Sequence, residues 1–428
     1  MSEITPITIG GQRGTAASAL ASPHGPVRSL YIHVPFCFHK CHYCDFYSFV
    51  DTRGRQGPFL DALERELAML AGHAGGGPRP GLDTIFVGGG TPSLLEVPLW
   101  ERLLAVLDRL FDLRSSPGLE FTVECNPETV TPELMAVMAA GGVNRVSVGA
   151  QSFHEAHLKT LERWHDPANV QRALSLASDA GIRRRNVDLI FGIPGQTLDE
   201  WQADLDRALA LDPGVDHISC YALTYEPNTP MTVRMNRGDF APIDEDIEVQ
   251  MHRHTVARLA GAGFGRYEVS NFARPGSECR HNLAYWRQHQ WLAAGPSASA
   301  HIGGWRWKNV PRLTEWMEGV EANMGYAPVR DVEGPDAARA LAERIMLGLR
   351  LSEGLDAAAI LRDAESIGVG AALQREIQRQ SDKGFLEQSA PRIVLNDRGF
   401  LFADGVAAEL MGAIDGARNT TARSEPGG

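Results

Sequence analysis

Short apolar runs alternate with amphipathic segments along the first half of the chain. Six runs have the length and composition of buried strands, and they lie at residues 29–34, 84–87, 121–123, 145–148, 186–190 and 217–221. Between them leucines recur at helical spacing, as at Leu60, Leu63 and Leu67. This alternation predicts an α/β fold whose parallel sheet has right-handed crossovers. Six units are too few for a complete eight-stranded barrel, so we predict a partial (β/α)6 TIM-like barrel.

The rhythm changes near residue 240. A long helix is predicted over 244–262, and a tryptophan-rich region follows it. Gly334-Pro335 then breaks the chain before a helical segment over 336–350. Two short apolar segments, 384–386 and 392–395, are typical of a hairpin joined at 389–391. Helices combined with a two-stranded wing predict a small C-terminal winged-helix-like α+β domain.

These patterns divide the chain into five segments. We predict a flexible lead-in, a core barrel, a connecting region, a C-terminal helical and winged domain and a disordered tail. Their boundaries are 1–28, 29–240, 241–333, 334–412 and 413–428.

Composition narrows the function classes. The 428 residues carry a net charge of −12, which disfavours nucleic acid as a main partner. No apolar run is long enough to span a membrane, and the first residues lack the pattern of a secretion signal, so we expect a cytoplasmic protein. Three of the six cysteines, Cys125, Cys220 and Cys279, are scattered, and we expect them to be small buried hydrophobes.

The other three cysteines lie within eight residues, directly after the first predicted strand. Cys37, Cys41 and Cys44 have the spacing Cys-x-x-x-Cys-x-x-Cys. A structural zinc site usually takes four protein ligands, and His39 and His42 leave that alternative open. Three thiolates without a second pair favour a four-iron cluster, because they leave one iron open for an outside ligand. A purely structural role for the three cysteines is the third interpretation.

This loop resembles that of the radical S-adenosylmethionine superfamily, and the barrel we predict is then of the radical SAM type. From residue 31 to about 401 the chain is similar to the oxygen-independent coproporphyrinogen III oxidase family, and most similar to its heme chaperone branch, HemW. The oxidases carry a fourth cysteine two residues after the third, where this chain has Phe46. This difference favours heme delivery over the alternative function, the oxidative decarboxylation of coproporphyrinogen III to protoporphyrinogen IX.

Polar residues at the ends of the predicted strands form the candidate cofactor site. A glycine triplet ends the second strand, where bare backbone can approach a ligand. Glu124 and Asp188 place carboxylates on otherwise apolar strands, which is costly unless a ligand pairs with them, and Arg163 is suited to gripping a carboxylate. Helix capping and solvated-surface roles remain the alternatives. The resemblance implies an S-adenosylmethionine site made by Tyr31, Tyr43, Gly89, Gly90, Thr91, Glu124, Gln151, Arg163, Asp188 and Ala222.

A second motif lies further along the chain. His281 and Tyr285 are four residues apart, so a helix would place them on one face with Asn282 beside them. The alternative is an ordinary polar helix face. The resemblance implies that this His-Asn-x-x-Tyr motif binds heme, with His281 as the first candidate ligand and Tyr285 as the second.

The resemblance also implies the partners. It implies a [4Fe-4S] cluster, S-adenosylmethionine and heme or another porphyrin as bound groups. It further implies an electron donor such as flavodoxin or ferredoxin, heme-receiving respiratory membrane proteins and a homodimer. Transient association with the inner face of the membrane follows from that delivery role. The winged end domain is expected to act as a lid, because the chain has no basic stripe for DNA.

Overall fold

The structure is a computed structural model that describes residues 14–113, 116 and 118–424, and it divides into two compact units. The second unit comprises Arg266–Asn271, Asn282–His289 and the chain from Pro335 onwards, and the remaining described residues form the first unit. Most of the segment 241–333, which we predicted as a separate connecting region, therefore belongs to the first unit.

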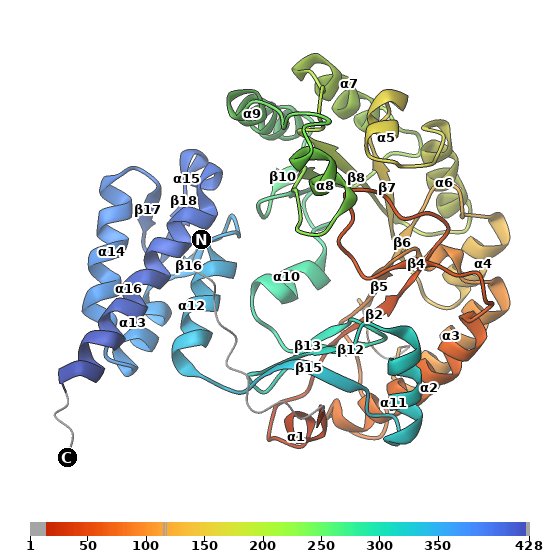
Figure 1. Ribbon diagram of the computed structural model, residues 1–428, viewed down its shortest axis with the longest axis horizontal. Coiled ribbons are helices and arrows are strands. Elements are labelled where there is room, and N and C mark those ends of the chain that lie inside the picture. Colours follow the sequence, from red (N-terminus) through yellow and green to blue (C-terminus); the bar gives the residue numbers. More distant parts are fainter. Residues whose placement is uncertain (1–13, 114–115, 117, 425–428) are drawn as a thin grey trace. The chain divides into compact units, whose positions relative to one another are not determined.

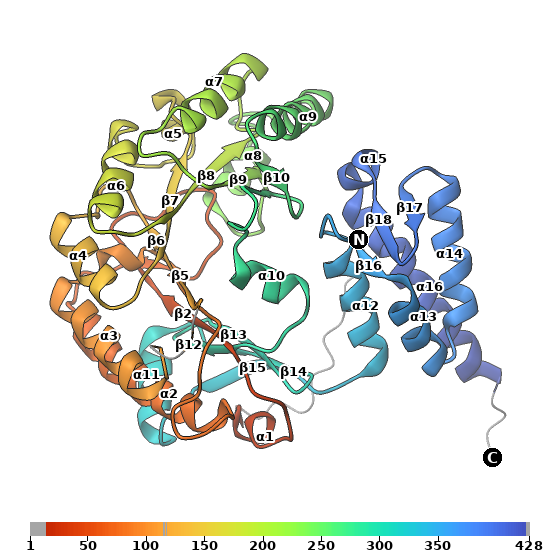
Figure 2. The same ribbon diagram turned by 180° about the vertical axis from the view of Figure 1, so that it is seen from behind.

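Six parallel strands with helices on their outer face form the centre of the first unit (Figure 1). Their order along the sheet is β9 (His217–Ala222), β8 (Arg184–Phe191), β7 (Arg145–Gln151), β6 (Glu120–Cys125), β5 (Thr84–Gly89) and β2 (Ser29–Val34). The connecting helices are α2 (Gln56–His73), α3 (Val97–Leu110), α4 (Pro132–Ala140), α5 (Glu155–Thr160), α6 (Ala168–Asp179) and α7 (Leu198–Leu209). They curve around the outside of the sheet in both views (Figure 2). The predicted partial (β/α)6 barrel is confirmed.

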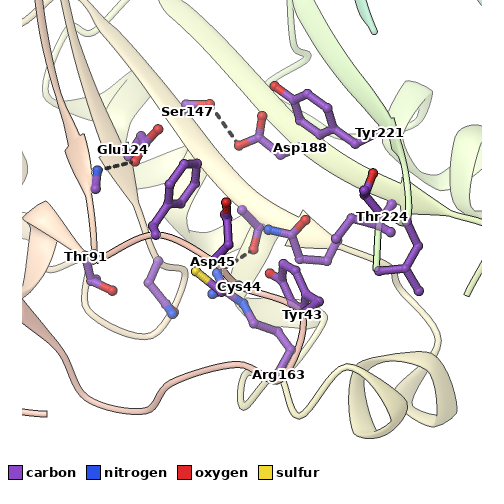
Figure 3. A pocket seen from close by; sticks show the side chains of 18 of the residues that line it. Tyr43, Cys44, Asp45, Thr91, Glu124, Ser147, Arg163, Asp188, Tyr221 and Thr224 are labelled. Atoms are coloured by element: carbon purple, nitrogen blue, oxygen red, sulfur yellow. Dashed lines mark hydrogen bonds between the residues drawn. The ribbon is translucent and has the colours of Figure 1, made fainter. Parts of the chain in front are cut away.

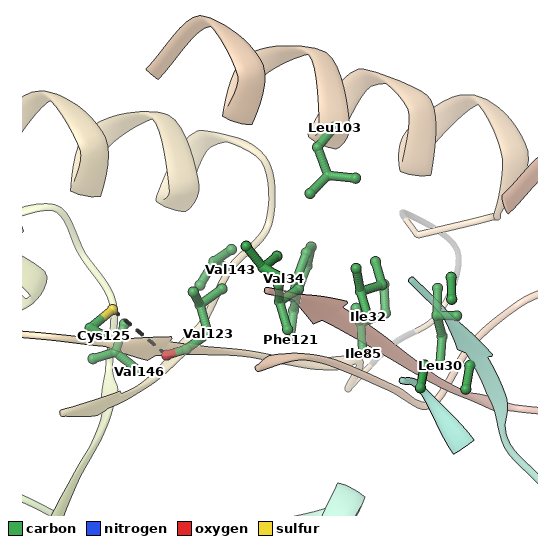
Figure 4. Close-up of a cluster of buried hydrophobic side chains, with 14 of the residues drawn as sticks. Leu30, Ile32, Val34, Ile85, Leu103, Phe121, Val123, Cys125, Val143 and Val146 are labelled. Atoms are coloured by element: carbon green, nitrogen blue, oxygen red, sulfur yellow. Dashed lines mark hydrogen bonds between the residues drawn. The ribbon is translucent and has the colours of Figure 1, made fainter. Parts of the chain in front are cut away.

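Alternating side chains divide these strands into two faces. On the outer face Leu30, Ile32 and Val34 of β2 are fully buried, and they belong to the same apolar cluster as Phe121 of β6 and Leu103 of α3 (Figure 4). Because successive residues of a strand point to opposite sides, the positions between these apolar ones face inward. The outer face holds the helices in place, and the inner face is left for polar chemistry.

Short strands that the sequence analysis missed complete the first unit. β12 (Leu292–Ala294) pairs in parallel with β2, and β11 (Asn271–Ala273) and β10 (Gly265–Arg266) lie beyond β9. A separate sheet has the order β1 (Gly14–Thr15), β15 (Pro328–Glu333), β14 (Trp305–Asn309) and β13 (Ser299–Ile302). Helix α10 (Arg280–Trp286) begins in the first unit and continues into the second from Asn282. The remaining elements of the first unit are α1 (Ala17–Leu20), β3 (Phe36–Cys37), β4 (Phe49–Val50), the 3-10 helix η1 (Pro92–Leu94), α8 (Pro230–Asn236), α9 (Glu245–Gly261) and α11 (Leu313–Ala322).

Part of the predicted flexible lead-in has regular structure. β1 pairs antiparallel with β15, and Ala19 and Leu20 of α1 are buried in the main core. The apolar side chains of this short helix explain the difference from the prediction, since their burial stabilises the segment. Residues 1–13 lie outside the described part of the chain.

The second unit has its own apolar core. Its elements are α12 (Ala337–Gly348), β16 (Leu355–Asp356), α13 (Ala357–Ser366), α14 (Gly370–Asp382), β17 (Leu386–Ser389), β18 (Arg392–Leu395), α15 (Asp397–Leu401) and α16 (Ala403–Ser424). β17 and β18 form the predicted antiparallel hairpin, and β16 pairs with β18. This order of helices and strands agrees with the winged-helix-like α+β prediction.

The predicted disordered tail is helical over most of its length. Helix α16 runs to Ser424, and residues 425–428 lie outside the described part of the chain. Leu410 and Ile414 are buried in the core of the second unit, and Ala417 packs against it. Their helical spacing gives this polar segment an apolar stripe that the composition concealed. Within the described ranges, no helix combines the length and apolarity needed to cross a bilayer.

Candidate functional site

A cavity of about 420 Å³ lies at the carboxyl ends of the parallel strands in the first unit. Figure 3 shows side chains converging on it from several strand ends and from the cysteine loop. Parallel α/β folds usually place their ligands at this edge. Its lining includes Tyr43, Cys44, Asp45, Phe46, Gly89, Gly90, Thr91, Glu124, Ser147, Gly149, Gln151, Arg163, Asp188, Tyr221 and Ala222.

The cysteine loop extends from β3 to β4 beside this cavity. Cys37 and Cys41 are buried, and Cys44 lines the cavity. The Thr91 hydroxyl donates to Cys37 Sγ over 3.5 Å, and Arg163 Nη1 donates to Cys41 Sγ over 3.7 Å. Burial, together with the nearby Cys41 and Cys37, raises the pKa of the Cys44 thiol to about 11. Three thiolates in this loop therefore need a positive centre to be stable together.

The spacing of these thiols bears on the kind of metal. In the described part of the chain, no three His, Cys, Asp or Glu side chains are grouped closely enough to hold a metal ion. Tetrahedral zinc, with Zn–S bonds of about 2.3 Å, needs sulfurs about 3.8 Å apart. A cubane binds one thiolate at each of three separate irons, so its ligands are spread more widely. A loop that offers three thiols and no fourth cysteine fits the cubane, which keeps one iron open, better than a closed zinc site.

The glycine loop, which comprises residues 88–91, is hydrogen-bonded to the backbone just before the first cysteine. Gly90 N donates to Val34 O and Thr91 N donates to Phe36 O, each over 2.7 Å. A Cβ atom on Gly90 would lie 2.7 Å from the Phe36 carbonyl oxygen, so the position has no room for a side chain. This contact fixes the glycine loop and the cysteine loop relative to each other.

Two buried carboxyl groups face the same cavity. Glu124 Oε2 accepts from Gly89 N over 3.0 Å, and Asp188 Oδ2 accepts from the Ser147 hydroxyl over 2.9 Å, as drawn in Figure 3. Burial, with Asp188 nearby, raises the pKa of Glu124 to about 8, and burial raises the pKa of Asp188 as well. An uncompensated acidic pair is costly to bury, and a cationic ligand would relieve that cost. The sulfonium and ammonium groups of S-adenosylmethionine fit this requirement.

Arg163 brings a positive charge to the opposite side of the cavity. Its Nη2 donates to Gly149 O over 3.0 Å, whereas its buried Nε has no hydrogen-bond partner among the described residues. Gln151 stands nearby with a positive φ of 61°, an uncommon conformation that often marks functional positions. A guanidinium with an unused buried donor suits a ligand carboxylate. The donor set of the cavity thus matches a zwitterionic nucleotide.

Nine of the ten residues predicted for the nucleotide site line this cavity, and Tyr31 does not. Tyr31 stacks on Phe86, and its hydroxyl lies 3.0 Å from His33 Nδ1. The sequence analysis missed several lining residues, notably Ser147, Gly149 and Tyr221. Ser147 and Gly149 lie four and two residues before Gln151 on β7, and this even spacing is the signal that would have found them. Tyr221 directly precedes Ala222 on β9, so no such signal pointed to it. The expected burial of Cys125, Cys220 and Cys279 is confirmed, with exposures of 4%, 3% and 1%.

The His-Asn-x-x-Tyr motif lies on α10, where the boundary between the two units falls after His281. His281 is fully buried, its Nδ1 is 2.8 Å from the Thr84 hydroxyl, and its ring stacks on Phe86. Thr84 begins β5, so His281 lies at the end of the strands opposite the cavity. Burial lowers the pKa of His281 to about 3, which keeps the imidazole neutral and able to bind a metal. Asn282 and Tyr285 belong to the second unit.

Comparisons with known families agree with this geometry. Residues 31–208 match the Radical SAM superfamily, and residues 336–402 match the HemN C-terminal domain. The coproporphyrinogen III oxidase HemN of Escherichia coli has a similar fold, with a TM-score of 0.78, 22% identity and coverage of 92% of each chain. At that identity the likeness establishes the fold alone.

Sequence relatives are closer. The chain is 38% identical to the heme chaperone HemW of Mycobacterium tuberculosis over 92% of this chain and 97% of the relative. It is 32% identical to the heme chaperone HemW of Bacillus subtilis, over 91% of this chain and 100% of the relative. Similarity of this extent covers both units rather than the barrel alone. The chain belongs to the heme chaperone HemW family of the radical SAM superfamily.

Proposed function

We propose that the cysteine loop holds a [4Fe-4S] cluster on Cys37, Cys41 and Cys44, and that the cavity beside it binds S-adenosylmethionine. When bound, such a cluster supplies one electron and an open iron for an outside ligand. Glu124 and Asp188 balance positive charge on the nucleotide, and the Arg163 guanidinium orients its carboxylate. Gly89 and Gly90 admit the ligand because they present bare backbone at the strand end, and Thr91 lines the cavity beside them.

The function we propose for the whole chain is that of a cytoplasmic heme chaperone. Heme binds through the motif of His281, Asn282 and Tyr285 and passes to respiratory membrane proteins, while a flavodoxin or ferredoxin supplies electrons and the protein forms a homodimer. The observation that carries the choice over the oxidase is Phe46. Phe46 lines the cavity and is 59% exposed, at the sequence position where the resembling oxidases carry their fourth cysteine.

The cofactor half of the proposal is tested by anaerobic reconstitution. We expect about four irons and four sulfides per chain, with the broad absorbance of such clusters near ~400 nm. Adding S-adenosylmethionine should then perturb the electron paramagnetic resonance spectrum of the reduced cluster. Loading of zinc in place of iron, with no response to the nucleotide, would contradict this half of the proposal.

The heme half is tested by two assays on the same preparation. A heme titration should give saturable binding with a defined Soret band, and replacing His281 by Ala should weaken it. In parallel, coproporphyrinogen III is incubated with dithionite and S-adenosylmethionine. Catalytic formation of protoporphyrinogen, which we do not expect, would favour the oxidase instead.

A further inference from the structure

Five aromatic rings stand in series inside the first unit, between His281 and the cysteine loop. The His281 ring stacks on Phe86 with centroids 5.3 Å apart, and Phe86 stacks on Tyr31 at 6.3 Å. Tyr31 lies 6.1 Å from His33, and His33 lies 6.4 Å from Tyr47. Tyr47 comes three residues after the last cysteine of the loop. The series therefore joins the proposed heme motif to the proposed cluster site.

The sheet itself sets this order. Tyr31 of β2 pairs in register with Phe86 of β5, so their side chains lie side by side on the inner face. His33 follows two residues after Tyr31 on the same face. These rings are consequently held by the most regular part of the barrel rather than by loops.

His33 connects the end of the series to both loops of the cavity. Its Nε2 lies 2.8 Å from the Tyr47 carbonyl oxygen, which can only accept, so Nε2 carries the proton. Burial lowers the pKa of His33 to about 4, so the ring is neutral and Nδ1 accepts from the Tyr31 hydroxyl over 3.0 Å. A Cβ atom on Gly89 would lie 2.6 Å from the His33 ring. A shift of this ring therefore displaces the cysteine loop and the glycine loop together.

We propose that Phe86, Tyr31 and His33 are positioning residues that couple heme binding at His281 to the geometry of the cysteine loop. The proposal rests on the function proposed above. The buried imidazole of His281 must leave its contacts with Thr84 and Phe86 to reach a porphyrin iron. Because a vacated space beside packed rings is costly, Phe86 moves to fill it, and Tyr31, His33 and Tyr47 behind it shift in turn. Such coupling is reciprocal, so cluster loading also changes heme affinity.

The test uses the full chain with its cluster reconstituted and reduced. Heme affinity is measured first by Soret titration, and zinc protoporphyrin, a diamagnetic porphyrin, is then added while the paramagnetic resonance of the cluster is recorded. We expect the porphyrin to shift the g values of the wild-type cluster. Phe86→Leu should reduce that shift at least threefold, while the iron content stays the same and heme affinity changes less than threefold.

Two further variants keep the test decisive. Phe86→Met leaves a side chain of similar volume to leucine but greater flexibility, and it replaces Phe86→Leu if that variant does not fold. Phe121→Leu removes a more deeply buried ring, on the outer face of the neighbouring strand, and it should keep the full shift. If heme binds but the wild-type g values do not move, or if both Phe86 variants keep the shift, this inference is wrong and the chaperone function stands. If the wild type binds no heme, both are wrong.

Discussion

At the residue scale, the candidate site contains buried ionisable side chains that other protein groups only partly compensate. Glu124 and Asp188 are held among strand ends, and Arg163 reaches Cys41 across 122 positions of sequence. The residue types were predictable, because a carboxylate or a guanidinium at the end of an apolar strand is unusual. Their partners were not, since only the folded sheet brings together segments so far apart.

Replacing Glu124 by Gln should change how stability depends on pH. The raised pKa of about 8 means that the folded state holds a proton that the unfolded state loses above its ordinary pKa of 4.5. The stability of the wild type should therefore fall as the pH rises from about 4.5 to 8. The glutamine variant does not titrate, so its advantage grows over this range. At about 1.4 kcal/mol per pKa unit, the difference in unfolding free energy between the variant and the wild type changes by a few kcal/mol over this range.

Urea unfolding of the apo-protein at several pH values measures this difference. Glu101→Gln, which changes an exposed carboxyl group on α3, is the matched control for the loss of a carboxylate as such. The same pH dependence of unfolding in the wild type and in Glu124→Gln would mean that Glu124 is ionised and paired in the folded protein.

The three loop cysteines should differ sharply from the scattered ones. Replacing Cys37, Cys41 or Cys44 by Ala removes one thiolate from a three-ligand site, so we expect iron content to fall from about four per chain to below one. Cys125→Ala, at a buried position outside the loop, should retain the cluster. Iron and sulfide analysis after anaerobic reconstitution checks both results. Full iron content in a loop variant would exclude that cysteine as a ligand.

At the element scale, the interiors of the central strands were predictable from the sequence, whereas the contacts at their ends were not. The sequence predicted the six central strands because each is a compact apolar run. It missed β12 and β11, which have three residues each, since so short a run carries no readable periodicity. The sequence also could not show that the glycine triplet packs against the chain just before the cysteine loop. That contact joins the ends of β2 and β5, whose paired residues are 55 positions apart.

Gly90→Ala tests this contact between the two loops. The added methyl group would meet the backbone at Phe36, which cannot rotate away, so we expect a loss of about 1–3 kcal/mol in stability. Cluster loading should also fall, because the cysteine loop is displaced. Gly72→Ala is the control, since nothing lies within 4 Å of its Cβ position on α2 and alanine is favoured there by up to about 1 kcal/mol. Equal stability and iron content in the two variants would contradict the expectation.

At the scale of the whole molecule, the chain has two cores with separate membership. Leu103 and Phe121 belong to the core of the first unit, and Leu373 and Ile345 belong to that of the second. The end of the strand–helix alternation near residue 240 indicated that a different kind of structure follows. The sequence pattern could not show that the chain returns to the first unit through β12 to β15, because composition does not reveal which distant segments pack together.

Because the two units have separate cores, we expect a core substitution in one unit to leave the other unit intact. Leu373→Ala, at a fully buried position of α14, should destabilise the second unit by about 2–5 kcal/mol. Iron content should remain at the wild-type value, because every proposed cluster ligand lies in the first unit. Calorimetry combined with iron analysis checks this, and Leu103→Ala is the reciprocal variant. Loss of iron in Leu373→Ala would show that the units do not fold independently.

The two-faced strands of the barrel have a consequence for how such proteins diversify. Residues that hold the scaffold and residues that line the cavity occupy neighbouring positions of one strand, as Val123 and Glu124 do on β6. Substitutions at alternate positions can therefore remodel the chemistry while the hydrophobic framework stays intact. A family built this way can exchange an oxidase for a carrier without inventing a new architecture.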